Sequence, residues 1–466
     1  MSKLKLSYQM DPLSELPDSL IFEILWWLPM RDVFRTSVLS KRWQNLWTTL
    51  PSLCINDMAI GSDTDRVGKL VNRALLMWRG TKFQKFFIYL ANLDDKSLYG
   101  DIDLWLRFAK EHQVEQLNLN LGYVDDRIEE YGSHPLEQTQ EEIYCIPQCL
   151  YSCRSLQTLF FEGCNLPIPI RNVEWDQLKK LTICGYGLSE DLINRVLCGS
   201  PRLEFLKLYV LENYENLSIR SSSLVHLSVD KYLYFTEDIP AMNTELRIWT
   251  PNLRRLEILG VPYSKCLINH LPFLTYANLD FYGRGDYSHH LFSGNDFVGE
   301  TLRQIFPTIQ YAQELILTNW SIKCLGVMQN RNMLSPFLNA NFLKLEYCCE
   351  DCNEILHFLG IFPKLERLVL EEKDSSKCKE LAKLEANRPD SFLQELKIVV
   401  ISWIACGEEE GDMFPFIEIL LKYACKLEKM EFRLKDTTPP SKDLVWAFKK
   451  LLRMPRSSPT AQLIFS

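Results

Sequence analysis

The segment SLQTLFFEGCNL, residues 155–166, spaces its apolar side chains as L-x-x-L-x-L-x-x-C-x-L. The apolar positions are Leu156, Leu159, Phe161, Cys164 and Leu166. Leu159 and Phe161 lie two residues apart, which is the spacing of a strand that buries one face. One such segment cannot bury its own apolar side chains, so the pattern predicts further copies that stack as a single parallel sheet.

Copies of this pattern recur along most of the chain. Clear copies begin at Leu178, Leu203, Leu224, Leu253 and Leu365, and degenerate copies begin at Phe83, Val114, Leu274, Ala312 and Ala340. The starts lie roughly 21 to 42 residues apart, and the pattern resembles the leucine-rich repeat of 20–29 residues. The alternative is a set of strands from several unrelated α/β domains.

The resemblance implies an α/β fold, an irregular leucine-rich-repeat solenoid with parallel strands on its concave face. Helices are expected in the long spacers, as at residues 189–197, and residues 281–310 are expected to form a loop insertion.

Residues between the apolar positions should point outward on the concave face. As candidate target-binding residues we select Phe160, Glu162, Phe205, Lys207, Tyr209, His226, Asp230 and Arg255. An ordinary solvated sheet face explains most of them individually. Our hypothesis is that a small cluster of aromatic residues, Phe160, Phe205 and Tyr209, anchors a ligand.

Near the N-terminus, the run LPDSLIFEILWWLPMRDVFRTSVLSKRWQNLW, residues 16–47, predicts three short helices. Asp18 or Ser19 is expected to cap the first helix and Ser40 the third. Three helices in about 40 residues bury little surface alone, so they need a partner chain or the following repeats. Periodicity alone leaves both alternatives open.

This run closely resembles the F-box, a motif that docks on a Skp-type adaptor and through it on a cullin scaffold. The resemblance implies that these residues contact the adaptor or support the contacting face: Leu16, Pro17, Ile21, Leu28, Pro29, Val33 and Leu39. It also implies that Ile24, Trp43 and Trp47 form the core of the motif. Trp26 departs from the usual residue, and either adaptor contact or packing on the repeats would explain it.

Residues 392–465 predict a strand, an acidic loop at 407–412, a helix, a second strand, a further helix and a final strand. The marks LEKM (427–430) and PRSSP (455–459) resemble the FBD region of plant F-box proteins. We therefore divide the chain into a leader (1–10), an F-box (11–55), leucine-rich repeats (56–385) and an FBD region (386–466). The last region should cap the repeats.

Composition narrows the class of function. The formal charge of −8 disfavours nucleic-acid binding, and no stretch reaches the roughly 20 apolar residues of a membrane span. No secretory signal follows Met1. We expect a protein of the nucleus, the cytoplasm or both, with its fifteen cysteines reduced.

No catalytic motif is recognisable, and the CxxC of residues 349–352 lacks a second ligand pair for zinc. We therefore expect no metal and no cofactor. The favoured interpretation is a non-catalytic substrate-recognition subunit of a Skp-cullin-F-box (SCF) ubiquitin ligase, which binds an unknown target protein. A non-degradative interaction scaffold is the alternative, and an enzyme or small-molecule receptor is a third reading.

Overall fold

The computed structural model describes residues 12–56, 64–90, 96–122, 143–186, 188–210, 216–231, 244–261, 263–281, 297–318, 321, 335–347, 352–372, 392–403, 414–434 and 442–466. The chain forms two compact units, residues 1–212 and 213–466.

The first unit begins with the F-box helices. They are η1 (Pro12–Glu15), α1 (Asp18–Trp26), α2 (Met30–Arg35) with η2 (Thr36–Val38), and α3 (Trp43–Leu46) with η3 (Trp47–Thr49). Proline has the φ that a helix start requires, and Pro17 and Pro29 occupy the N-cap positions of α1 and α2. The predicted side-chain caps are wrong: Asp18 lies inside α1 and pairs with Arg42, and Arg42 rather than Ser40 precedes α3.

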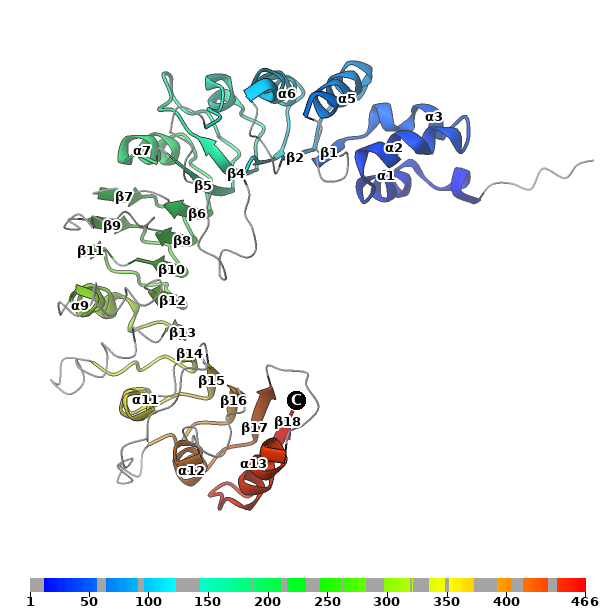
Figure 1. Cartoon of the computed structure of the whole chain (residues 1–466). Helices are drawn as coiled ribbons and strands as arrows, with labels where there is room; N and C mark the ends of the chain where they lie inside the picture. Colours follow the sequence, from blue (N-terminus) through cyan, green and yellow to red (C-terminus); the bar gives the residue numbers. More distant parts are fainter. Residues whose placement is uncertain are drawn as a thin grey trace, which may run out of the picture. The chain divides into compact units, whose positions relative to one another are not determined.

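The rest of the first unit is a parallel sheet in chain order. Its strands are β1 (Ser52–Asn56), β2 (Lys85–Tyr89), β3 (Gln116–Asn120), β4 (Thr158–Asn165), β5 (Lys180–Tyr186) and β6 (Phe205–Val210). The helices α5 (Thr64–Met77), α6 (Tyr99–Glu111) and α7 (Glu190–Cys198) lie along one side of these strands (Figure 1). Short 3-10 helices are η4 (Lys96–Leu98) and η7 (Gln148–Ser152).

The repeat copies predicted at Phe83, Val114, Leu156, Leu178 and Leu203 are confirmed as strands β2–β6. The helix predicted at 189–197 is confirmed as α7, where the hydroxyl of Ser189 accepts the backbone N–H of Leu192.

The second unit continues the repeat pattern in one parallel sheet. Its strands are β8 (His226–Lys231), β10 (Arg255–Gly260), β12 (Tyr276–Phe281), β13 (Glu314–Leu317), β14 (Phe342–Tyr347), β15 (Arg367–Glu372), β16 (Ile398–Trp403), β17 (Lys429–Leu434) and β18 (Gln462–Phe465). Leu256 and Ile258 of β10 align with Leu227 and Val229 of β8, and all four side chains are buried. The buried alternation fixes the register, because a slip of one residue would expose every leucine.

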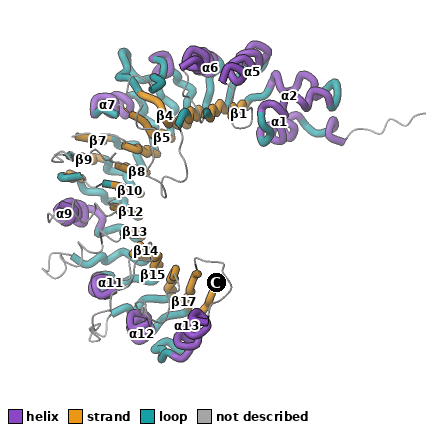
Figure 2. The backbone as a smooth tube through the Cα atoms, in the orientation of Figure 1, coloured by secondary structure: helices purple, strands orange, loops and turns teal. Residues whose placement is uncertain are grey.

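Helices and a second sheet fill the spacers of this unit (Figure 2). The helices are α9 (Phe297–Ile309), α11 (Cys352–Leu359), α12 (Phe414–Tyr423) and α13 (Lys442–Arg453), and the second sheet has the order β11 (Lys265–Ile268), β9 (Glu245–Trp249), β7 (Asn216–Arg220). Two expectations are corrected: part of the predicted loop at 281–310 is α9, and the described residues of the spacers between Val210 and Leu274 form strands where helices were expected. None of the helices within the described ranges is long and apolar enough to cross a membrane.

Candidate functional site

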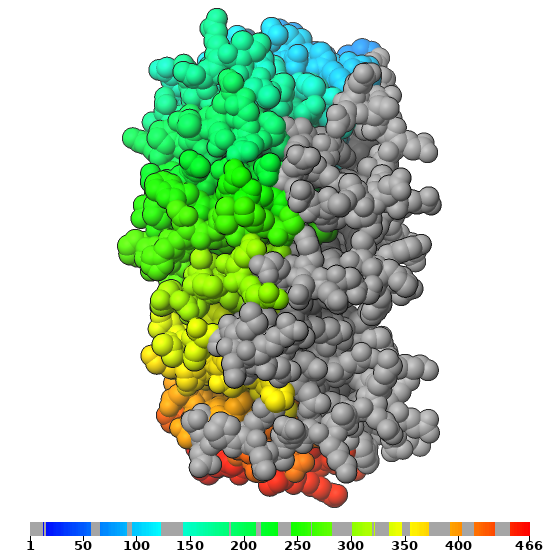
Figure 3. All heavy atoms as spheres, turned by 90° about the vertical axis from the view of Figure 1, so that its left-hand side faces the viewer, coloured from blue at the N-terminus to red at the C-terminus, as the bar shows by residue number. Residues whose placement is uncertain are grey.

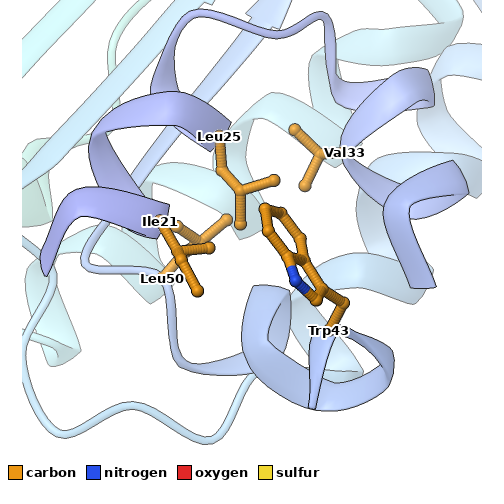
Figure 4. Close-up of a cluster of buried hydrophobic side chains, with 5 residues drawn as sticks. All are labelled: Ile21, Leu25, Val33, Trp43 and Leu50. Atoms are coloured by element: carbon orange, nitrogen blue, oxygen red, sulfur yellow. The ribbon is translucent and has the colours of Figure 1, made fainter. Parts of the chain in front are cut away.

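The first helix of the F-box carries two apolar stripes side by side. Ile21 and Leu25 point into a core completed by Val33, Trp43 and Leu50 (Figure 4). One residue earlier in each turn, Leu20, Ile24 and Trp27 repeat the i, i+4, i+7 spacing but remain 51%, 39% and 80% exposed. The core uses one stripe and leaves the other in solvent.

More apolar side chains are exposed on the same motif. Leu13, Val38 and Leu39 are exposed, as are the prolines Pro17 and Pro29. So many exposed large apolar residues on a motif of about 40 residues mark a protein-interaction surface rather than a solvated helix face.

The structure sorts the predicted F-box residues into three groups. Pro17, Pro29 and Leu39 are exposed, whereas Leu16 and Leu28 are partly buried against the core. Ile21 and Val33 are buried, so they can only support the exposed apolar surface of the motif from beneath. Trp43 is buried as expected, and partly buried Trp47 meets the Phe34 ring edge-on at 4.7 Å.

The structure corrects the prediction for Ile24. It was expected in the core, but its side chain lies on the exposed stripe because Leu25 occupies the core position of that turn. Sequence reasoning also missed Leu20, Trp27 and Val38 as surface residues. The signal was available for the first two, since a helix with apolar residues at both i and i+1 in successive turns is too broad for one small core.

The F-box contacts the first repeats through hydrogen bonds and a shared apolar cavity. The indole N–H of Trp78 donates to the Leu50 carbonyl oxygen at 2.8 Å, and the backbone N–H of Arg79 donates to the Thr48 carbonyl at 2.7 Å. A small apolar cavity between the two parts is lined by Met30, Val33, Phe34, Trp47, Leu50, Ser52, Leu53, Ala74, Leu75, Trp78 and Phe83. The helices therefore serve also as the N-terminal cap of the array.

Trp26 also packs at this contact between the F-box and the first repeats. Its ring meets the Phe87 ring of β2 edge-on with centroids 5.2 Å apart, and the Lys85 ammonium lies 5.1 Å from its centroid. Of the two roles left open, the structure supports packing on the repeats.

Replacing Trp26 by alanine should therefore loosen the F-box from β2. We expect a loss of about 1–2 kcal/mol in the free energy of unfolding, because an aromatic pair and a cation–π contact disappear. Thermal unfolding and amide hydrogen exchange over residues 18–50 measure it. Trp27→Ala is the matched control, since that indole is exposed and should change stability by less than about 0.5 kcal/mol. Equal losses in the two variants would contradict the assignment.

On the sheet of the first unit, outward residues form aligned rows. One row runs through Phe87, Asn118, Phe160, Thr182 and Lys207 across β2–β6. The next row runs through Tyr89, Asn120, Glu162, Cys184 and Tyr209. The two rows combine four aromatic rings with amide, hydroxyl, thiol, carboxylate and ammonium groups, a composition that suits protein recognition.

The candidate residues of this face differ in accessibility. Phe160, Phe205 and Tyr209 are half-buried, and the Lys207 ammonium lies 4.6 Å from the centre of the Tyr209 ring. Glu162 is buried instead, and its Oε2 accepts the Asn120 amide at 2.6 Å. Burial raises the pKa of Glu162 to about 7. Glu162 therefore holds Asn120 in place. The prediction that Glu162 contacts a target is corrected, because its side chain is buried.

The candidate residues of the second unit lie on adjacent strands. His226 of β8 is the register partner of Arg255 of β10. His226 Nε2 lies 3.4 Å from Glu257 Oε1, and the Arg255 guanidinium stacks on Tyr276 at 3.6 Å from the ring centre. Asp230 is buried, so the prediction that it contacts the target directly is corrected. His226 and Arg255 are half-buried and remain candidates.

Within the described ranges, no group of three or more His, Cys, Asp or Glu side chains is placed to hold a metal ion. Residues 349–351 of the CxxC lie outside the described residues. Cys145, Cys149 and Cys153 do not share a helix, because only a short 3-10 helix forms at Gln148–Ser152.

Comparison with known protein families identifies two stretches of the chain. A model of the F-box domain matches residues 13–54, and a model of the leucine-rich repeats of FBD-associated F-box protein At5g56370 matches residues 102–271. These matches confirm the F-box and the repeats expected from the sequence.

Similar curated proteins include three from Arabidopsis thaliana. F-box/LRR-repeat protein At3g03360 is 27% identical over 72% of this chain and 65% of its own length. F-box/FBD/LRR-repeat protein At5g56420 is 27% identical over 58% of this chain and 60% of its own length. This chain therefore spans less than two thirds of the length of each of these two relatives. F-box/FBD/LRR-repeat protein At1g13570 is 26% identical over 98% of both chains.

Proposed function

We propose that this chain, an F-box/FBD/leucine-rich-repeat protein of the plant type, is the substrate-recognition subunit of an SCF ubiquitin ligase. The exposed stripe of Leu20, Ile24 and Trp27 would bind the Skp-type adaptor, and the strand faces of the repeats would bind the target. The stripe is the observation that carries the proposal, because nothing in the fold of the motif requires it to be apolar. We place the protein in the nucleus, the cytoplasm or both.

The chain would contribute no catalytic group of its own. Its effect on rate would be proximity, since a target lysine held near a ubiquitin-loaded enzyme reacts as if at high local concentration. A non-degradative scaffold is the second candidate. It shares the adaptor contact but leaves its bound protein unmodified.

Reconstitution separates the two candidates. The chain is assembled with a Skp-type adaptor, a cullin, its RING partner and a ubiquitin-loaded enzyme, and co-purifying proteins are tested for ubiquitin attachment. We expect ubiquitination that disappears when Leu20, Ile24 and Trp27 are all alanine. Assembly with the adaptor but without modification of any bound protein would favour the scaffold.

Target binding should depend on the aromatic residues of the first unit. Alanine at Phe160, Phe205 and Tyr209 together is expected to weaken capture of the target at least about tenfold, because half-buried aromatic side chains supply most of the binding energy of such faces. Quantitative pull-down measures it, with adaptor binding unchanged. Ile170→Ala is the control, since Ile170 is exposed but lies outside the strands. Undiminished capture by the triple variant would remove the three aromatics from the target site.

A further inference from the structure

The second sheet of the second unit has one buried face and an opposite face that is exposed along β9 and β11. Leu217, Ile219, Leu246, Ile248 and Cys266 point inward and are buried. Thr244, just before β9, is also buried, and its hydroxyl contacts Lys231 of the main sheet at 3.1 Å. The second sheet therefore backs the main sheet across a shared interior. Its exposed face lies on the side that Figure 3 turns toward the viewer (Figure 3).

The exposed face carries apolar side chains that the fold does not use. Trp249 of β9 and Leu267 of β11 are 46% and 45% exposed. Beyond the strand ends, exposed Tyr311 meets the exposed His270 ring at 6.1 Å. Alternation along β9 explains the arrangement: Leu246 and Ile248 fill the interior, so Arg247 and Trp249 must face solvent.

Basic residues surround these apolar side chains. Arg220 of β7 is the register partner of Trp249 and is exposed. Glu245 accepts from Arg247 at 2.5 Å and lies 3.0 Å from the Lys265 ammonium. Arg247 and Lys265 thus share one carboxylate, and the four side chains of Arg220, Arg247, Lys265 and Glu245 together carry a formal charge of +2 on a chain of formal net charge −8.

We infer that this outer patch, made of Arg220, Arg247, Trp249, Lys265, Leu267 and Tyr311, docks an acidic protein segment that carries an apolar anchor. Carboxylates of the segment pair with the cations, and its apolar side chain packs between Trp249 and Leu267. Tryptophan and arginine side by side are the residues most enriched in binding hot spots. A pure phosphate-binding surface would not need the exposed Trp and Leu, so a protein fits better than a nucleic acid.

The docking goes beyond the proposed function. The outer patch and the outward rows of β8 and β10 lie on opposite sides of the shared interior of the second unit, so a target on one face leaves the other free. A second protein, such as a regulator or a further subunit, can then bind while the target is held.

Peptide selection tests the inference on the full chain, with or without a bound adaptor. A library of random peptides of about 12 residues is panned on the wild type and counter-selected on an Arg220→Glu/Trp249→Ala variant. We expect the selected peptides to be acidic, to contain a large apolar residue, and to bind wild type at least about tenfold more tightly than the variant. Added salt should weaken them, because the paired charges are exposed.

Three results would overturn the inference. In the first, the selected peptides are neutral or basic. In the second, no selected peptide distinguishes the wild type from the Arg220→Glu/Trp249→Ala variant. In the third, an oligonucleotide binds at the same residues and displaces the peptides. Leu267→Ser, which keeps all charges, should also weaken the peptides and guards against misfolding of the double variant. Phe160→Ala should leave them unaffected. Adaptor binding reports separately on the proposed function, so failure of one is distinguishable from failure of the other.

Discussion

Alanine at Leu20, Ile24 and Trp27 together should lower the affinity for a Skp-type adaptor at least about 100-fold and abolish co-purification. Each exposed apolar side chain that becomes buried on binding contributes roughly 1–2 kcal/mol, and about 1.4 kcal/mol corresponds to a factor of ten. The summed contribution of three such side chains therefore exceeds the binding free energy that a 100-fold loss of affinity represents. Because all three lie in solvent in the free chain, the free energy of unfolding should change little.

The choice of positions matters for this test. Leu16 and Leu28 also belong to the motif, but they pack on its core, so replacing them would confuse loss of folding with loss of binding. Leu76→Ala is the matched control, because Leu76 of α5 is more exposed than any of the three and lies outside the F-box. Isothermal titration with purified adaptor measures the affinity. Full binding by the triple variant would mean that the three helices only cap the repeats.

The repeat fold was predictable from sequence because one spacing recurs with a clear physical demand. Leu156, Leu159 and Phe161 identify their strand alone, and the weaker copy at Ala312 forms a strand because it lies in the same register. The second sheet was missed although its signal exists. Asn216–Arg220 and Glu245–Trp249 alternate polar and apolar residues with period two, but short spacer strands are easily mistaken for helix or loop.

The site was harder to predict than the fold. A helix with apolar residues at Leu20, Ile21, Ile24 and Leu25 does not say which pair the core will take, since that depends on where α3 places Trp43. Glu162 has the spacing of an outward residue, yet neighbouring groups bury it. Spacing predicts the direction in which a side chain leaves its strand, whereas accessibility depends on what packs over it.

Lys231 shows what burial does to a charged group in this fold. Its side chain is fully buried inside the second unit, where the ammonium donates to the Thr244 hydroxyl at 3.1 Å and lies 4.6 Å from the centre of the Tyr263 ring. Burial lowers the pKa of Lys231 from the ordinary 10.5 to about 8. One hydroxyl and one ring do not replace the hydration that the ammonium loses.

Replacing Lys231 by methionine should stabilise the second unit at neutral pH. Below pH 8 the lysine is charged in both the folded and the unfolded chain, so the whole cost of burying the charge is present, at most about 3 kcal/mol at 1.36 kcal/mol per pKa unit. Between pH 8 and 10.5 the unfolded chain binds more protons, so wild-type stability rises with pH and the cost disappears. We expect a gain of about 2–3 kcal/mol at pH 7 that shrinks toward zero near pH 10.5, because methionine fills a similar volume.

Chemical denaturation at pH 7 and at pH 10 measures this difference. Thr244 keeps a partner in the variant, because its hydroxyl also accepts the backbone N–H of Ser264 at 3.3 Å. Lys265→Met is the control: that ammonium is exposed, so its replacement should give no gain that depends on pH. A variant at Lys231 that is less stable than wild type at pH 7 would show that the contacts with Thr244 and Tyr263 outweigh the lost hydration. In that case the buried ammonium would be a stabilising link between the two sheets.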